Sequence, residues 1–399
     1  MFEHIDTYAG DPILTLNETF MKDERPDKVN LSIGVYLNEE GKLPLMRAVR
    51  QAEIFIAAQA DNRPYFPMEG SLHYRNSAAN LIFGKDHRVL QQGLLANVQT
   101  VGGSGALKVG ADFLARYFPK SSVWIGRPTW DNHYAIFAGA GMRINEFPYY
   151  DANTRSVDFS SMLNAIKRIP EGDIVLLHAC CHNPTGADMS VEQWHELANL
   201  IRERALLPFF DMAYQGFGQG INDDAYAPRH FAEQGIPFLL ANSFSKNFSL
   251  YGERCGLLSV LCSDRAQTER VLGQLKFTVR RNYSSPPAHG ARIISTVLQS
   301  DELYESWISE LDEMRARVQM MRRDLHGALS TSMPELRFDY LLKQTGMFSF
   351  TGLSSSDVDR LRTEFAVYLV GSGRICLAAL TKHTSAATVK AIAQLMAST

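Results

Sequence analysis

The sequence predicts an α/β protein with a mainly parallel central sheet flanked by helices and a smaller α+β domain. From about residue 97 the chain alternates short apolar runs with longer segments of helical periodicity. This alternation is typical of βαβ units, whose helices cover the faces of a parallel, buried sheet. After about residue 266 long helical segments dominate, followed by two short β segments and a final helix. The change predicts a second, smaller unit.

Each expected strand is a short apolar run that ends in a polar or glycine-rich turn. The expected strands cover residues 29–36, 97–101, 122–125, 174–179, 207–210, 238–242, 256–261, 347–351 and 375–378. The expected helices cover residues 45–59, 106–118, 132–138, 190–205, 266–281, 287–299, 302–330 and the chain from about 385. Asp11-Pro12 is expected to open a first helix, with aspartate as N-cap. Ser190 and Gln193 form a capping-box pattern.

Composition narrows the class of protein. The 399 residues are 45% hydrophobic and 21% charged, which is ordinary for a soluble globular protein. The 40 lysines and arginines nearly balance the 43 acidic residues, which argues against nucleic acid or an anionic membrane as the main partner. Five cysteines are too few, and odd in number, for a disulfide framework. With no signal-peptide pattern at the start and no membrane-length apolar run, we expect a cytoplasmic protein.

Three local motifs leave alternatives open. The glycine-rich stretch 102–105 lacks both common nucleotide-binding spacings, but it joins a strand to a helix and could bind a phosphate or be a plain turn. Residues 178–182 read His-Ala-Cys-Cys-His, but the spacing does not fit zinc ligands, so we expect no metal. Ser243 and Lys246 match the S-x-x-K pattern of acyl-transfer enzymes, without its companion motifs.

A stronger hypothesis combines a carboxylate with an amine. Asp211 follows the expected strand 207–210, and Lys246 follows the expected strand 238–242, 35 residues later. Since the carboxyl ends of parallel strands line one crevice, both side chains should lie there. Such a pair suits pyridoxal phosphate, whose aldehyde a lysine binds as a Schiff base and whose ring nitrogen an acid holds protonated.

Further residues fit the same cofactor. Arg254 could make a two-pronged phosphate contact, helped by donors from residues 103–105. Trp130 follows a strand, where its indole could stack on a flat ring or simply pack in the core. Asn183 opens a turn after the strand 174–179. Each position alone has an ordinary structural explanation, so the hypothesis depends on their combination.

Together the motifs resemble the class I, fold-type I pyridoxal-phosphate aminotransferases, in the aspartate and aromatic amino-acid subgroup. The stretches that carry the resemblance are 102–107, 128–133, 182–186, 210–217, 243–248, 280–284 and 371–374. They occur in family order over nearly the whole chain. The stretches 11–16, 67–70 and 271–287 look most like the bacterial aromatic-amino-acid enzymes.

The resemblance implies a role for each matching residue. It implies that Lys246 carries the cofactor and the proton and that Asp211 pairs with the ring nitrogen, with His133 behind it. The remaining cofactor contacts that it implies are Tyr214, Asn183, Trp130, Gly103, Ser104, Gly105, Ser243, Ser245, Arg254 and, from a second subunit, Tyr65. It further implies substrate contacts by Arg374 at the α-carboxylate, Arg280 from the partner at a side-chain carboxylate, Gly34, Trp130 and Asn183.

The resemblance also implies an organisation and an activity. The expected parts are an N-terminal arm (1–13), a large cofactor-binding domain (43–313) and a small domain (14–42 with 314–399), in a homodimer with shared sites. The expected activity transfers the amino group of tyrosine, phenylalanine and aspartate to 2-oxoglutarate by a ping-pong mechanism. A dedicated aspartate aminotransferase is the alternative within the class. A serine acyl-transfer enzyme and a non-enzymatic regulator are the alternatives outside it.

Overall fold

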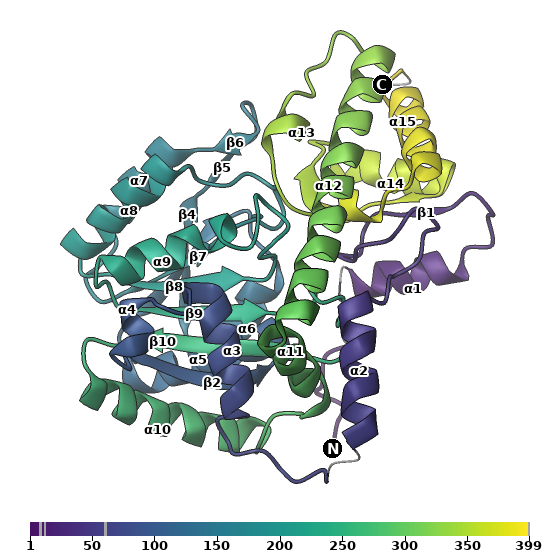
Figure 1. Cartoon of the computed structure of the whole chain (residues 1–399). Helices are drawn as coiled ribbons and strands as arrows, with labels where there is room; N and C mark the ends of the chain where they lie inside the picture. The colour runs from purple at the N-terminus through teal and green to yellow at the C-terminus, as the bar shows by residue number, and fades with distance from the viewer. Residues whose placement is uncertain (8–9, 12, 60–61, 398–399) are drawn as a thin grey trace.

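A seven-stranded sheet forms the centre of the computed structural model of the chain (Figure 1), which describes residues 1–7, 10–11, 13–59 and 62–397. In spatial order its strands are β2 (Leu95–Val101), β10 (Cys255–Leu261), β9 (Phe238–Ser243), β8 (Leu207–Met212), β7 (Ile174–His178), β3 (Ser122–Arg127) and β4 (Arg143–Pro148). Only β10 runs antiparallel to its neighbours. The mainly parallel sheet predicted from the sequence is therefore confirmed.

Helices cover both faces of this sheet because its strands are apolar on both sides. Phe209 belongs to the hydrophobic core on one face and Phe210 to the core on the other, as the alternation of side chains along a strand requires. One face is covered by α5 (Gly102–Tyr117), α6 (Asn132–Gly139) and α10 (Arg265–Asn282). The other is covered by α3 (Leu72–Phe83), α7 (Phe159–Ile166), α8 (Val191–Glu203), α9 (Tyr226–Glu233) and α11 (His289–Gln299).

The long helix α12 (Asp301–Ser332) runs from the sheet-bearing part of the chain to a smaller C-terminal unit (Figure 1). This unit contains α13 (Tyr340–Lys343), α14 (Ser355–Phe365), α15 (Lys382–Ala397) and the antiparallel pair β11 (Phe348–Phe350) and β13 (Arg374–Cys376). Near the N-terminus, β1 (Val29–Asn30) pairs with β12 (Val367–Tyr368) of this unit. The exact domain boundaries stay a prediction.

The remaining elements are short or lie before the sheet. They are α1 (Leu14–Lys22), α2 (Arg47–Gln59), α4 (Arg88–Gln91), β5 (Tyr150–Asp151), β6 (Ser156–Val157) and the 3₁₀ turns η1 (Asp223–Ala225) and η2 (Leu377–Ala379). No helix in the described ranges has the length and apolarity needed to cross a membrane.

Several local expectations need correction. The strand expected over 29–36 pairs only at Val29–Asn30, because the chain then leaves β12 and lines a cavity. The glycines expected to form a turn before a helix are themselves the first turn of α5. Helix α1 begins at Leu14 rather than at Asp11, although the Asp11 carboxylate accepts hydrogen bonds from the backbone N–H groups of Ile13 and Leu14. Pro12 lies outside the described residues. The capping box at Ser190 and Gln193 is confirmed.

Candidate active site

A cavity of about 310 Å³ opens at the carboxyl ends of the parallel strands, with the α5 N-terminus beside it. The register explains the convergence: His178 of β7 pairs with Asp211 of β8, which pairs in turn with Ala241 of β9. Eleven of the site residues expected from the sequence line this cavity: Gly34, Gly103, Ser104, Trp130, Asn183, Asp211, Tyr214, Ser243, Ser245, Lys246 and Arg254. One crevice therefore collects residues that span more than half of the chain.

The Lys246 amine lies in this cavity. The residue is half-buried, and its nitrogen lies over the Tyr214 ring, 4.8 Å from the ring centroid. Burial lowers the pKa of Lys246 to about 8, with contributions from the positive charges of Arg254 and Arg374, although the negative charge of Asp211 opposes the shift. A substantial fraction of the amine is therefore neutral near physiological pH, as a nucleophile or a general base requires.

Asp211 is held as a carboxylate by a chain of hydrogen bonds. Its Oδ2 lies 3.0 Å from His133 Nε2, and His133 Nδ1 lies 2.8 Å from the hydroxyl of Thr129. Burial by itself would raise the pKa of Asp211, but the His133 hydrogen bond and the nearby charge of Lys246 together lower it below its ordinary value. The site thus presents a fixed negative charge, and His133, at the N-terminal end of α6, orients it from behind.

The other end of the cavity has the chemistry of an anion site. The hydroxyls of Ser243 and Ser245 lie 3.2 Å apart, and Arg254 Nη1 lies 3.3 Å from Ser245 Oγ. Within the described chain Arg254 has no carboxylate within ion-pair distance, so its charge is available to a ligand. Gly103 and Ser104 add the positive end of a 16-residue helix. These donors fit a phosphate group.

Glycine is required where α5 meets Arg254. Gly102 has a φ of +68°, and a Cβ at this position would collide with the Arg254 guanidinium. A Cβ on Gly103 would lie 3.0 Å from that of Ser243. Gly105, also expected to touch a cofactor, packs against Val101 deeper in the helix and does not line the cavity. The first two glycines therefore permit the close backbone approach that a phosphate needs.

Arg374 supplies a second cationic group from the C-terminal unit. It is 4% exposed, donates to Asn183 Oδ1 at 3.2 Å and to the carbonyl oxygen of Ser32, and lies 4.4 Å from the Phe348 ring centroid. Its Nε is buried without a hydrogen-bond partner in the described structure. A buried donor without a partner is costly, so this nitrogen points to an acceptor supplied by a ligand. A carboxylate fits the arginine fork.

Other side chains shape the cavity, and some were not anticipated from the sequence. Burial raises the pKa of Tyr214 well above its ordinary value, so its hydroxyl stays protonated and can donate a hydrogen bond. Tyr251, Ile33 and Val35 also line the cavity and were not predicted. The Tyr251 hydroxyl accepts a hydrogen bond from the Tyr36 backbone N–H at 2.9 Å. Tyr251 follows Lys246 by only five residues, but no local pattern marked it.

Five expected site residues are not among those that line this cavity: His133, Gly105 and Arg374, which are described above, and Tyr65 and Arg280. The side chain of Tyr65 is 95% exposed. Arg280 is exposed near the end of α10, where it bonds to the Ser284 hydroxyl. Their expected contacts involve a partner subunit, so both stay predictions.

The His-Cys-Cys-His stretch does not form one cluster. Among the described residues, His178 groups with His133 and Asp211, whereas Cys180 and Cys181 group with Asp224. Burial lowers the pKa of His178 to about 3 and thus keeps it neutral. His178 and the two cysteines of this stretch therefore belong to two different groups of side chains.

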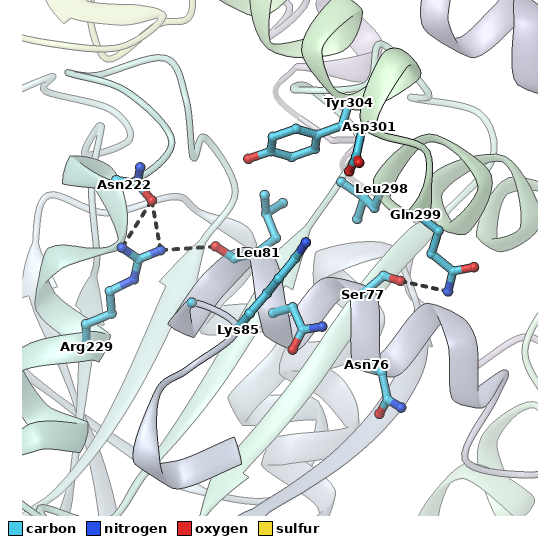
Figure 2. Close-up of a pocket in the computed structure, with 12 residues that line it drawn as sticks. Asn76, Ser77, Leu81, Lys85, Asn222, Arg229, Leu298, Gln299, Asp301 and Tyr304 are labelled. Carbon is cyan, nitrogen blue, oxygen red and sulfur yellow. Dashed lines mark hydrogen bonds between the residues drawn. The ribbon is translucent and has the colours of Figure 1, made fainter. Parts of the chain in front are cut away.

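A second cavity, of about 470 Å³, lies between α3, α11 and the start of α12 (Figure 2). The Lys85 side chain extends into it, and Arg229 lies at its side (Figure 2). The Arg229 guanidinium already donates to the carbonyl oxygens of Leu81 and Ile82 and to Asn222 Oδ1. Lys85 is exposed, and among the described residues no carboxylate lines this cavity beside it except Asp301. We therefore assign the chemistry to the cavity around Lys246.

Comparison with known proteins assigns the family. The model of class I and II aminotransferases matches residues 26–392. The chain belongs to this family. The similarity to solved structures extends over nearly the whole chain. One is the aromatic-amino-acid aminotransferase from Burkholderia pseudomallei, solved covalently bound to pyridoxal phosphate. It is 47% identical to this chain with a TM-score of 0.97, and the match covers 99% of each chain.

Some relatives are named as aromatic-amino-acid or tyrosine aminotransferases and others as aspartate aminotransferases. The aromatic-amino-acid aminotransferase of Escherichia coli (strain K12) is 56% identical over 99% of this chain and 100% of its own length. The tyrosine aminotransferase of Klebsiella pneumoniae is 53% identical over the same shares. The aspartate aminotransferase of Pseudomonas aeruginosa is 45% identical, again over 99% of this chain and 100% of its own length. An aminotransferase is thus established, in place of an acyl-transfer enzyme or a non-enzymatic regulator.

Proposed function

We propose that this aminotransferase uses pyridoxal 5'-phosphate to transfer the amino group of tyrosine, phenylalanine and, in addition, aspartate to 2-oxoglutarate. The observation that carries the proposal is the Lys246 amine in one cavity with Asp211 and an anion site. The higher identity to enzymes named for aromatic or tyrosine substrates favours this function over a dedicated aspartate aminotransferase.

The cofactor's three functional groups match three parts of the cavity. When bound, pyridoxal phosphate supplies an aldehyde that combines with amines and a protonated ring that accepts the electron pair of the broken Cα–H bond. Ser243, Ser245 and Arg254 would hold its phosphate with the N-terminal turn of α5. Asp211 would keep the ring nitrogen protonated, and Lys246 would bind at the aldehyde.

The remaining polar groups would orient the ring and move protons. Tyr214, Asn183 and Trp130 line the cavity. In this proposal Tyr214 and Asn183 would hydrogen-bond the ring oxygen and Trp130 would stack on the ring face. The neutral Lys246 amine would take the proton from the substrate Cα and carry it during the transfer. Arg374 would fix the substrate α-carboxylate so that this proton faces Lys246.

The proposal includes a homodimer with shared sites. Tyr65 and Arg280 are conspicuously exposed for residues expected to bind ligand, which agrees with their acting in the site of a partner subunit. Tyr65 would then reach the phosphate and Arg280 a side-chain carboxylate. We also propose a cytoplasmic location, since all five cysteines are free and buried, as in proteins of a reducing compartment.

The proposed function is tested by steady-state kinetics with 2-oxoglutarate as acceptor. We expect turnover of tyrosine, phenylalanine and aspartate, with kcat/KM for the aromatic substrates at least equal to that for aspartate. Parallel double-reciprocal lines should show the ping-pong mechanism. Turnover of aspartate without measurable turnover of tyrosine and phenylalanine would establish the dedicated aspartate enzyme instead.

Replacing Arg280 with valine should separate the two substrate classes. We expect kcat/KM for aspartate to fall by about 10- to 100-fold, because a charge-assisted hydrogen bond contributes about 1.5–3 kcal/mol. Phenylalanine has no side-chain carboxylate, so its kcat/KM should change less than about threefold by the same argument. The exposed neighbour Arg281 provides the control, and Arg281→Val should leave both values near those of the wild type. Equal losses for aspartate and phenylalanine would remove Arg280 from substrate selection.

A further inference from the structure

Arg322 of α12 is a buried arginine whose guanidinium forms no ion pair with a carboxylate in the described structure. It is 3% exposed, and within the described structure it forms no ion pair at 4.0 Å or less. Its guanidinium donates to one stretch of chain that begins at the end of α13. The acceptors are the carbonyl oxygens of Leu341 (3.3 Å), Thr345 (2.9 Å), Gly346 (2.9 Å) and Phe348 (2.6 Å) and the hydroxyl of Ser349 (2.8 Å).

The half-buried carboxylate of Asp188 also holds this stretch. Asp188 accepts hydrogen bonds from the backbone N–H groups of Cys181 at 2.7 Å and His182 at 2.8 Å, and from the Thr345 hydroxyl. Thr345 therefore contacts both charged groups, since its hydroxyl donates to Asp188 and its carbonyl oxygen accepts from Arg322. Each charge lowers the cost of burying the other. Two sequence-distant parts of the chain are joined here by one bridging residue.

Both joined parts lie next to groups of the expected substrate site, Asn183 on one side and Arg374 on the other. Residues 181–182 directly precede Asn183, which lines the cavity and accepts a hydrogen bond from Arg374. On the other side, the Phe348 ring lies 4.4 Å below the Arg374 guanidinium and meets the edge of Tyr214 at 5.7 Å between ring centroids. The carbonyl oxygen of Phe348 is one of the Arg322 acceptors. A shift of residues 345–349 would therefore move the Phe348 ring, against which the Arg374 guanidinium packs.

Packing leaves little freedom for any other arrangement. Gly186 has a φ of +69°, and a Cβ there would collide with the carbonyl oxygen of Phe348. Gly346 has a φ of +71°, and a Cβ there would contact Cys181 at 2.5 Å. Residues 345–349 thus lie directly against the loop 181–186, and the hydrogen bond from the Thr345 N–H to the Gly186 carbonyl oxygen (2.8 Å) closes the contact.

We propose that Arg322 is a positioning residue for recognition of the substrate α-carboxylate, which acts by fixing residues 345–349 and, through the Phe348 ring, the Arg374 guanidinium. Asp188 anchors the same residues to the loop that carries Asn183. The inference rests on the proposed function, because Arg374 must be the carboxylate clamp. A purely structural role for Arg322 would lower the stability of its variants, because their acceptors lose a donor, without changing the affinity for a carboxylate ligand.

The test compares Arg322→Met and Arg322→Lys with Arg323→Met, its exposed neighbour on α12. Holoenzyme is titrated with maleate, a dicarboxylate that cannot be transaminated, by calorimetry, and kcat and KM are measured with tyrosine and 2-oxoglutarate. For Arg322→Met we expect the maleate Kd and both KM values to rise about tenfold, since small displacements of a positioning group have large effects. The cofactor absorbance and kcat should change less than about threefold, because a loss of uniform substrate binding raises KM without lowering kcat.

The lysine variant keeps the inference testable if the methionine variant does not fold. Lysine retains the charge but cannot reach all five acceptors, so Arg322→Lys should raise the Kd by an intermediate factor. Adding Phe348→Leu to either variant should weaken maleate binding by less than the two single substitutions predict when their effects are added, because both act through the contact of Phe348 with Arg374. Unchanged maleate affinity in a folded Arg322 variant, or an equal loss in Arg323→Met, would overturn the inference. A wild-type enzyme that binds maleate but transaminates nothing would instead contradict the proposed function.

Discussion

Lys246→Ala should abolish transamination, with kcat at least about 10⁴-fold below that of the wild type, because general-base catalysis alone supplies about 10²–10⁴-fold. The variant also loses the amine that binds the cofactor aldehyde. Since a buried amine is costly, the folded state should be at least as stable as the wild type. Kinetics, thermal unfolding and mass spectrometry after borohydride reduction measure the three effects, and reduction should attach cofactor to no lysine of the variant.

Lys85 provides the matched control, because its amine extends into the second cavity (Figure 2). Lys85→Ala should retain the wild-type rate and the borohydride-labelled Lys246 peptide. If Lys246→Ala kept substantial transamination, or if Lys85→Ala lost it, the chemistry would have been assigned to the wrong cavity.

Asp211→Ala should lower kcat by about 10²–10³-fold or more, the usual effect of removing one charge that stabilises a transition state. Without the carboxylate the ring nitrogen loses the partner that keeps it protonated, and His133 loses its hydrogen bond at 3.0 Å. We expect the unfolding free energy to fall by about 1–3 kcal/mol because the buried Nε2 of His133 is left without a partner. Stopped-flow half-reactions and thermal unfolding separate the catalytic from the structural loss.

Asp173 provides the control, because it is a buried carboxylate that lies away from the cavity. It directly precedes β7, at the end of the strand opposite the cavity, and accepts hydrogen bonds from the Ser122 N–H (2.9 Å) and the Trp124 indole (2.8 Å). Asp173→Ala should therefore destabilise the protein by a similar amount while leaving kcat nearly unchanged. A normal half-reaction rate in Asp211→Ala would contradict its role as the partner of the ring nitrogen.

The predicted elements that the structure confirms are those with strong apolar periodicity. The buried strands β7, β8 and β9 were each predicted to within one or two residues, since a strand buried on both faces is a continuous apolar run. β4 was missed because it is an edge strand with mostly exposed, polar residues. α3 was missed because its own residues are buried on most sides of the helix. Its sequence therefore lacks the alternation of an apolar face and a polar face that indicates a surface helix. α14 is largely polar, and only the capping box at Ser354 and Asp357 could have revealed it.

What the sequence determined by itself is the pairing of Lys246 with Asp211, because both follow buried strands, and parallel strands present their carboxyl ends at one edge. The glycine and serine donors near Arg254 could be predicted for the same reason. Only the tertiary structure showed that Ser32, Tyr251 and Phe348 surround Arg374 and Lys246, and that Arg322 and Asp188 meet at Thr345. The hydrogen bonds from Arg374 to Ser32 and from Thr345 to Asp188 join residues 342 and 157 positions apart in the sequence. Local periodicity reports which side of an element is buried, whereas the identity of the neighbour is set by the packing of whole elements against each other.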